Sequence, residues 1–307
     1  MNQKRFDLME QHETLNRPLI LDGAVGSLLY QRNVAPHKVL WSSFANLTNP
    51  NEVLKLHKEY IDSGSEIITT NTFRTNPTAF KKTTLEFSLE EFVKKSVQLA
   101  IDAREDKMIV IAGSNAPAED CYQTERTISK HELEYNHKKH IELLWENGCD
   151  IIWNETQSHW DEIEIICRFC SQNTFPFLVN LYFDEALNIL SGEPLYEAVK
   201  FIEEFSPVAI GFNCIKADLF ERFRENYPLP KYFGFYFNCG SGSPRYHIGR
   251  ADSVNDEIIL CGVEPQSYVT TIEPLLRMNP LFVGSCCGSN PDHTKAIKEK
   301  FDEVYRN

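Results

Sequence analysis

The sequence lacks the features that identify several large protein classes. No run of eighteen apolar residues occurs and residues 1–13 are polar and charged, so neither a membrane span nor a secretory signal peptide is indicated. Positive charge is also scarce, because 31 lysines and arginines stand against 44 aspartates and glutamates, a formal net charge of -13. Such an excess repels phosphate backbones and acidic membranes. We therefore expect a cytoplasmic protein whose partners are neither nucleic acids nor membranes.

Common cofactor and metal motifs are missing too. Residues 22–26 read Asp-Gly-Ala-Val-Gly, which lacks the G-x-G-x-x-G spacing that brings backbone close to a pyrophosphate, and no P-loop is present. The absence of H-E-x-x-H and H-x-H argues against a zinc protease and against the usual metal-dependent hydrolase barrel. His137 and His140 are three residues apart on a predicted helix, but we expect that helix to be mostly solvated and favour no metal role for them.

The sequence does contain a regular alternation of short apolar segments with amphipathic ones. Eight β-rich segments predict strands at 18–22, 66–70, 108–112, 150–153, 175–182, 208–212, 232–237 and 281–283. Helical periodicity lies between most of them, for instance at 52–63, 89–103, 131–147, 158–171, 194–205 and 269–278. Apolar strands that alternate with helices indicate a parallel sheet covered on its outside, and eight units fit a (β/α)8 TIM barrel. An open doubly wound sheet is the alternative, which the missing glycine motif disfavours.

The composition indicates one globular unit. Hydrophobic residues make up 42% of the chain, which is enough to build a sizeable core. No Gly/Ser/Pro-rich linker and no charge block divides the chain. We therefore expect a single domain over residues 1–307.

Polar residues follow the predicted strands, at the end of a barrel where an active site would lie. They are Asp22, Asn71, Thr72, Ser114, Asn115, Glu155, Thr156, Asn180, Tyr182, Asn213, Cys214, Asn238, Cys239, Cys286 and Cys287. A polar residue at the end of an apolar strand is common, so each one alone favours a structural role. The cysteines are less ordinary, because nine of them in a long chain without an indicated signal peptide are poorly explained by disulfides.

Three of these cysteines form a candidate metal site. Cys214 follows the sixth predicted strand, and Cys286-Cys287 follows the eighth between Gly284 and Gly288, which allow a backbone turn. Three thiolates suit zinc and leave its fourth position for a substrate. Three small buried hydrophobic residues or a vicinal redox pair are the alternatives, and the barrel context favours zinc.

The other thiols are predicted to pack in the interior. Side-chain alternation along the seventh strand predicts that Asn238 points inward and Cys239 outward. We expect ordinary packing for Cys121, Cys149, Cys167 and Cys170.

The segments that carry these features resemble the homocysteine S-methyltransferase family. The matching residues are Asp22–Ser27, Leu40–Ser42, Thr69–Phe73, Asn154–Thr156 with Glu162, Gly211–Cys214 and Gly284–Gly288, within a resemblance from about Pro18 to Ile297. In that family, a (β/α)8 barrel, the cysteines matching Cys214, Cys286 and Cys287 bind zinc. The resemblance implies an enzyme of methionine biosynthesis that moves a methyl group from a sulfonium or ammonium donor to the zinc-bound thiolate of homocysteine. S-methylmethionine is the favoured donor, with S-adenosylmethionine and betaine as alternatives.

The same resemblance implies roles for residues around the metal. Asp22 and Glu155 would hold the amino group of homocysteine, Thr156 or Thr72 would support them through hydrogen bonds, and Asn238 would line the mouth of the barrel. Cationic donors are attracted to aromatic faces, for which Trp41 and Phe73 are candidates. Core packing is an equal alternative for Trp41 and the favoured one for Phe73.

The sequence departs from the family pattern in loops that would shape the donor side. The departures are residues 112–117 and 119–122 after the third strand, Phe237 where a proline is usual, and Ser285 where a glycine is usual. Two other functions remain open: an oxidoreductase that uses Cys286-Cys287, and a non-catalytic protein that binds zinc and thiol amino acids. Assembly into a homo-oligomer is compatible with the sequence.

Overall fold

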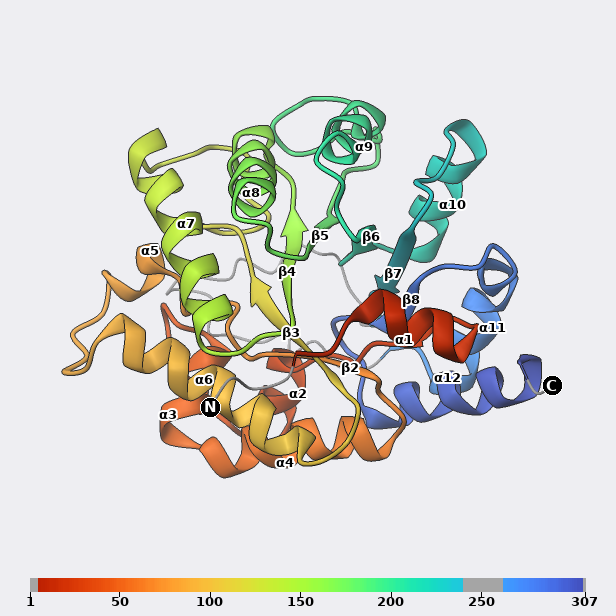
Figure 1. The fold of residues 1–307 in the computed structure, drawn as a ribbon, viewed down its shortest axis with the longest axis horizontal. Coiled ribbons are helices and arrows are strands. Elements are labelled where there is room, and N and C mark those ends of the chain that lie inside the picture. The colour runs from red at the N-terminus through yellow and green to blue at the C-terminus, as the bar shows by residue number, and fades with distance from the viewer. Residues whose placement is uncertain (1–4, 240–261, 306–307) are drawn as a thin grey trace.

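The computed structural model describes residues 5–239 and 262–305, and its eight parallel strands alternate with helices around a nearly closed barrel (Figure 1). The strands are β1 (Leu19–Ile20), β2 (Ile67–Thr69), β3 (Val110–Asn115), β4 (Ile151–Gln157), β5 (Phe177–Leu181), β6 (Ala209–Asn213), β7 (Phe233–Phe237) and β8 (Phe282–Ser285). β1 pairs with β8, and backbone hydrogen bonds from Glu66 to Ile20 (2.7 Å) and from Asp22 to Ile67 (2.9 Å) connect it to β2. The predicted (β/α)8 TIM barrel is confirmed.

The helices surround the sheet, and several of them begin or end at residues with recognisable capping roles. They are α1 (Leu8–Leu15), α2 (Gly26–Gln31), the 3₁₀ turn η1 (Ser42–Phe44), α3 (Ala45–Thr48), α4 (Pro50–Asp62), α5 (Pro77–Phe80), α6 (Leu89–Arg104), α7 (Lys130–Glu146), α8 (Trp160–Gln172), α9 (Leu195–Glu203), α10 (Ala217–Asn226), α11 (Pro265–Leu276) and α12 (Pro291–Val304). Ser88 and Ser129 form capping boxes at α6 and α7. Gly64 and Gly148 end α4 and α7 at φ values of 109° and 100°, as their positions predict. Within the described residues, none of these helices is long and apolar enough to cross a membrane.

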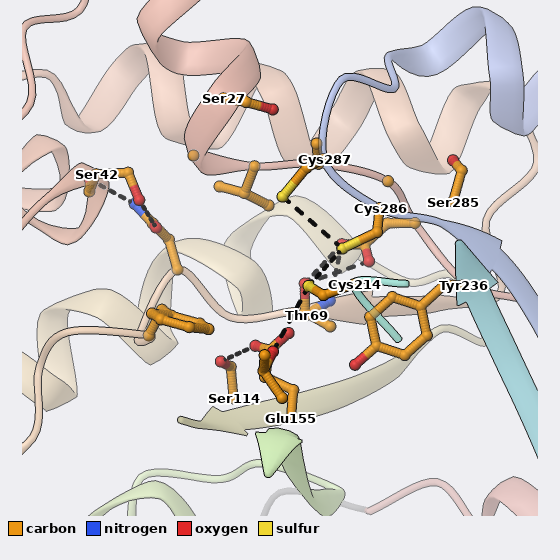
Figure 2. Close-up of a pocket in the computed structure, with 18 of the residues that line it drawn as sticks. Ser27, Ser42, Thr69, Ser114, Glu155, Cys214, Tyr236, Ser285, Cys286 and Cys287 are labelled. Carbon is orange, nitrogen blue, oxygen red and sulfur yellow. Dashed lines mark hydrogen bonds between the residues drawn. The ribbon is translucent and has the colours of Figure 1, made fainter. Parts of the chain in front are cut away.

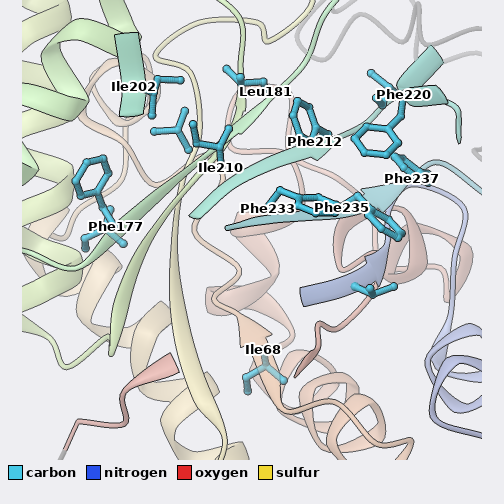
Figure 3. Close-up of a cluster of buried hydrophobic side chains, with 14 of the residues drawn as sticks. Ile68, Phe177, Leu181, Ile202, Ile210, Phe212, Phe220, Phe233, Phe235 and Phe237 are labelled. Atoms are coloured by element: carbon cyan, nitrogen blue, oxygen red, sulfur yellow. The ribbon is translucent and has the colours of Figure 1, made fainter. Parts of the chain in front are cut away.

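Alternate strand residues supply two separate hydrophobic layers. The inner cluster fills the barrel and includes Leu19, Val110, Ile151, Trp153, Tyr236 and Phe282. The outer cluster lies between strands and helices, and Figure 3 shows its aromatic part on β6, β7 and α10. There the Phe220 ring of α10 lies 5.1 Å from Phe212 and 5.5 Å from Phe237. Cys239 belongs to this outer cluster, so the prediction that it points outward is confirmed.

The helix α1 closes the N-terminal end of the barrel. Its Leu8 packs against the inner cluster, the Phe6 amide donates to the Asp150 carboxylate (3.0 Å), and the Gln11 side chain donates to the Met108 carbonyl (3.4 Å). Asp150 and Met108 precede β4 and β3, so α1 lies at the start of the strands. The cavity described below therefore opens at their C-terminal ends.

Helix α7 is less solvated than we expected from the sequence. His137 and His140 are fully buried against β3, where the Asn115 amide contacts both rings. His140 also bonds the Thr75 hydroxyl through Nε2 at 2.9 Å, and Glu162 lies 3.4 Å from His137 Nε2. These histidines are structural partners of the loops after β2 and β3.

Candidate functional site

A cavity of about 720 Å³ lies at the C-terminal ends of the strands and opens to solvent. It is lined by Leu21, Asp22–Ser27, Trp41, Ser42, Thr69–Asn71, Phe73, Ser114, Cys121, Tyr122, Glu155, Thr156, Cys214, Tyr236 and Ser285–Cys287. Asp22 and Glu155 are the only formally charged side chains among these described residues, so the cavity is acidic.

The three predicted metal ligands meet on one side of this cavity. The Sγ atoms of Cys214, Cys286 and Cys287 all lie within 4.8 Å of one another, and no other His, Cys, Asp or Glu cluster of this kind occurs in the described part of the chain. The Cys214 and Cys286 sulfurs are 3.1 Å apart, and those of Cys286 and Cys287 are 4.0 Å apart, as the dashed lines in Figure 2 mark. Three soft ligands at these separations can hold a metal ion.

A strained backbone conformation orients the Cys214 side chain. Cys214 has a φ of 56° and Thr156, across from it on β4, has a φ of 58°. Positive φ is rare for a β-branched residue and persists only where contacts enforce it. Asn213 makes these contacts, accepting from the Thr156 amide (3.0 Å) and donating to the Thr156 hydroxyl (3.0 Å). The Thr156 hydroxyl in turn lies 3.7 Å from the Cys214 sulfur.

The three thiols lie close enough to shift the pKa values of one another. Hydrogen bonds from Cys214 and Cys286 hold the pKa of the Cys287 thiol well below its usual value. The same contacts with Cys214 and Cys287, together with burial, raise the pKa of Cys286. A bound dication is what would allow all three sulfurs to ionise together.

Asp22 is a buried carboxyl fixed by one neighbour. Its oxygens accept from the Thr69 amide (2.8 Å) and the Thr69 hydroxyl (3.1 Å). Burial nevertheless raises the pKa of Asp22 well above its usual value, and the bonds from Thr69 only partly offset that effect. A cationic group entering the cavity would favour the carboxylate form.

Glu155 faces the cavity from β4 and is held by two hydroxyl groups. Ser114 on β3 donates to its Oε1, and Tyr236 on β7 also hydrogen-bonds it. In Figure 2, the Ser114 and Tyr236 hydroxyls point toward Glu155 from opposite sides. The Tyr236 oxygen accepts from Trp153 Nε1 at 3.1 Å, which leaves its own proton for Glu155. Burial raises the pKa of Glu155 to about 7 despite the Ser114 bond.

Sequence reasoning missed this support for Glu155. Ser114 was identified as a residue at a strand end, but nothing in the sequence places its hydroxyl on Glu155. Tyr236 stands at an inward position of β7, and its distance along the chain from Glu155 hides their contact. The available signal was the alternation of β7, which places Tyr236 inside the barrel.

The opposite part of the cavity is aromatic. Trp41 and Phe73 both line it, with ring centroids 5.9 Å apart in an edge-to-face arrangement. Tyr122, in the loop after β3, adds a third ring and packs edge-on against Tyr182 at 5.1 Å. Arg126 fixes the same loop by ion pairs to Asp161 (2.6 Å) and Glu162 (2.7 Å) at the start of α8.

Two predicted substrate residues do not line the cavity. Thr72 is fully buried and donates to the Ser114 carbonyl (2.7 Å), and Asn238 donates through its amide to the Cys214 carbonyl (2.8 Å). Both therefore contact residues of the cavity wall from behind. Cys121, for which we expected ordinary packing, does line the cavity.

Three other cysteines pack in the outer hydrophobic cluster. Cys149, Cys167 and Cys170 are buried in the outer cluster, as predicted, and Cys261 lies outside the described residues.

Three comparisons with known proteins agree with one another. The family model described as Homocysteine S-methyltransferase matches residues 19–301. A selenocysteine Se-methyltransferase of Brassica oleracea var. italica is 23% identical over 316 residues, covering 92% of this chain and 88% of the relative. The homocysteine S-methyltransferase of Escherichia coli (strain K12) is 28% identical over 218 residues, covering 64% and 69%. The metallated crystal form of the Escherichia coli homocysteine methyltransferase MmuM superposes with a TM-score of 0.77 at 21% identity, covering 96% of this chain and 100% of that chain.

Proposed function

Because the chain belongs to the homocysteine S-methyltransferase family, we propose that it transfers a methyl group from a sulfonium or ammonium donor to the sulfur of homocysteine, giving methionine. The observation that carries this proposal is the Cys214, Cys286 and Cys287 cluster inside an acidic cavity. The new carbon–sulfur bond forms as the donor's carbon–sulfur or carbon–nitrogen bond breaks. The electron pair of that broken bond leaves with the donor, which becomes a neutral thioether or amine.

The three cysteines fit zinc as the resident metal. Zinc–sulfur bonds of about 2.3 Å in a tetrahedron place the sulfurs roughly 3.8 Å apart. The observed separations of 3.1 and 4.0 Å lie on either side of that value. Zinc supplies a Lewis acid that lowers the pKa of a substrate thiol, so that no protein base is needed to deprotonate it.

The two carboxyls hold the amino group of the acceptor in this proposal. Homocysteine carries an ammonium group, and Asp22 and Glu155 are the charged side chains that face the cavity. A cation beside them favours their ionised forms, which burial alone disfavours. Ser114 and Tyr236 orient Glu155, and Thr69 orients Asp22. Binding of the ammonium group would then fix the direction of the homocysteine chain toward the cysteines, which favours in-line attack.

Trp41 is the better of the two candidate donor contacts. The Phe73 ring already has the Arg74 guanidinium 5.4 Å from its centroid. In the described part of the chain, no lysine or arginine stacks on the Trp41 ring. A cationic methyl donor can therefore use the Trp41 face without competing with a protein cation.

A donor screen with homocysteine tests the proposal. Reduced protein loaded with zinc is incubated with S-methylmethionine, S-adenosylmethionine or glycine betaine, each labelled in the transferred methyl group, and labelled methionine is measured. We expect transfer from at least one donor, with S-methylmethionine the most active. The Cys287→Ala variant is the matched control and should give none. Failure of all three donors with the zinc-loaded wild-type protein would refute the proposal.

A further inference from the structure

Trp41 has a backbone conformation that its neighbours must enforce. Its φ of 46° and ψ of -132° lie in a region that bulky residues rarely adopt. Such a conformation persists where surrounding contacts over-determine it, and it often marks a functional position. Trp41 also lines the cavity, so the contacts that hold its backbone also fix its indole ring.

The contacts that enforce this conformation form a closed turn from His37 to Trp41. The His37 amide donates to the Trp41 carbonyl (3.1 Å), and the Trp41 amide donates to the His37 carbonyl (2.8 Å). Inside the turn, Nδ1 of His37 accepts from the amides of Val39 (3.1 Å) and Leu40 (3.0 Å). One imidazole nitrogen thus satisfies two backbone donors that the strained turn would otherwise leave without a protein partner.

The indole is also confined from its other side. A Cβ atom at Gly26 would lie 2.2 Å from Cη2 of Trp41, so only glycine allows the ring to occupy its present place. Phe73 meets the same ring edge-on. In Figure 2, Ser42, the next residue after Trp41, lies on the opposite side of the cavity from Tyr236, which supports Glu155. The position of Trp41 is therefore set by the His37 turn, Gly26 and Phe73, and it is separate from the carboxyl side.

We propose that His37 is a positioning residue for the methyl donor, because its side chain holds the turn that presents Trp41 to the cavity. The inference deepens the proposed function and rests on it, since Trp41 is taken there as the face that receives the cationic donor. His37 itself does not line the cavity. Its influence is expected on the donor alone, since the metal ligands and the two carboxyls come from other segments of the chain.

Two substitutions at His37 distinguish the role of its hydrogen-bond acceptor from the role of the rest of the side chain. His37→Ala removes the acceptor for the Val39 and Leu40 amides. His37→Asn replaces it, because an asparagine oxygen readily accepts from backbone amides two or three residues further on. We expect His37→Ala to raise the donor KM about 10-fold while the homocysteine KM and zinc content stay within about 2-fold. His37→Asn should restore the donor KM to within about 3-fold of wild type.

A second perturbation moves the same ring without altering the turn. In Gly26→Ala the added methyl group would collide with the outer edge of the indole at Cη2, so this variant should also raise the donor KM. This variant keeps the proposal open to refutation if His37→Ala fails to fold. An unchanged donor KM in Gly26→Ala, or an equal loss of donor and acceptor affinity in His37→Ala, would overturn the proposal.

Fluorine NMR of protein labelled with 5-fluorotryptophan reports on the environment of Trp41, and so on the conformation of the turn, independently of enzyme activity. The Trp41 resonance, assigned with Trp41→Phe, should shift or broaden in His37→Ala and keep its wild-type position in His37→Asn. An unperturbed resonance in His37→Ala would refute the positioning role even if transfer activity is found. If the wild-type protein transfers no methyl group from any donor, the proposed function fails, and the donor role of His37 fails with it. The NMR result still decides whether His37 holds Trp41 in place.

Discussion

The cysteine wall of the cavity and its aromatic wall are built in different ways. The cysteine wall, formed by Cys214, Cys286 and Cys287, lies at the ends of β6 and β8 and is held by strand pairing and by Asn213. The aromatic wall, formed by Trp41, Phe73 and Tyr122, lies on loops. Those loops are held by side-chain contacts such as His37 Nδ1 with Val39 and Leu40.

Because of this difference, we expect the two walls to tolerate amino-acid substitution to different degrees. Strand ends are fixed by the barrel, so a metal ion bound there would have a well-defined set of ligand positions. Loops tolerate substitution more readily, so the aromatic wall can vary without disturbing the cysteine wall. Of the departures from the family pattern, residues 116–117 and 119–122 fall on the loop that carries Tyr122, whereas residues 112–115, Phe237 and Ser285 lie in strands β3, β7 and β8.

The largest expected effect comes from breaking the cysteine wall. Cys287→Ala leaves two sulfurs, so the protein should lose its metal and its methyl transfer should fall on the order of 1000-fold. Metal content by mass spectrometry and methionine formation measure the two losses. Cys239→Ala is the matched control, because that thiol lies in the outer cluster and its removal should leave the metal bound. A Cys287→Ala protein that retains both metal and activity would contradict this assignment.

A smaller effect is expected for the acceptor carboxyl. In the proposed function the Glu155 carboxylate pairs with the ammonium group of homocysteine, so Glu155→Gln should raise the homocysteine KM about 100-fold while the donor KM changes little. Ser114→Ala should show the same pattern more weakly, at about 5-fold, since it removes one hydrogen bond to Glu155. Steady-state kinetics with each substrate varied in turn provide the measurement. Equal effects on both substrates would mean that the two walls are not separable.

A substitution in the aromatic wall should affect the donor KM rather than the homocysteine KM. Trp41→Leu keeps an apolar side chain but removes the ring face, so the donor KM should rise about 10-fold and the homocysteine KM should stay the same. Competition assays sharpen this prediction. The affinity for a neutral thioether analogue of the donor should fall less than the affinity for the cationic donor. Equal losses for the two ligands would show that Trp41 contributes packing alone.

A last prediction concerns His140 of α7, which contacts Thr75 and Asn115 and affects stability rather than methyl transfer. Burial lowers the pKa of His140 to about 3, so from pH 6.5 down to about pH 3 an unfolded chain binds a proton there that the folded chain does not. This histidine therefore makes the folded state less stable as the pH falls, by about 1.4 kcal/mol per pH unit. His57, with a pKa of about 4, acts in the same direction.

Comparison with His140→Gln isolates this contribution. Glu155 opposes it, because a carboxyl with a raised pKa contributes stability as the pH falls through about 7. In urea unfolding of the metal-free protein between pH 6.5 and 4, the difference in stability between wild type and His140→Gln should change by about 1.4 kcal/mol per pH unit. A difference that is independent of pH would rule out a neutral buried His140.

Much of the fold could be predicted because the local pattern of apolar residues indicates which segments form buried strands. All eight apolar segments became strands, and alternation correctly placed Cys239 outside the barrel. Local sequence was misleading for helix α7. Its polar and charged residues predicted a solvated helix, although His137 and His140 lie on its buried face. A buried histidine is satisfied by distant partners such as Asn115 and Thr75, which local patterns do not reveal.

The site was less predictable where it depends on backbone strain and distant contacts. The cysteine cluster followed from strand ends and the family resemblance. Positive φ at Thr156 and Cys214 could not be inferred, because neither residue type prefers it and Asn213 enforces it through tertiary contacts. The turn from His37 to Trp41 was missed for the same reason, since its only sequence signal is a histidine in a loop.

The central claim is that the three cysteines hold a metal whose remaining position accepts the substrate thiol. X-ray absorption at the zinc edge, measured on reduced zinc-loaded protein before and after addition of homocysteine, tests it directly. We expect three sulfur ligands at about 2.3 Å without homocysteine and four with it. A sulfur count that stays at three when homocysteine is bound, or zinc that has no sulfur ligands, would contradict the account.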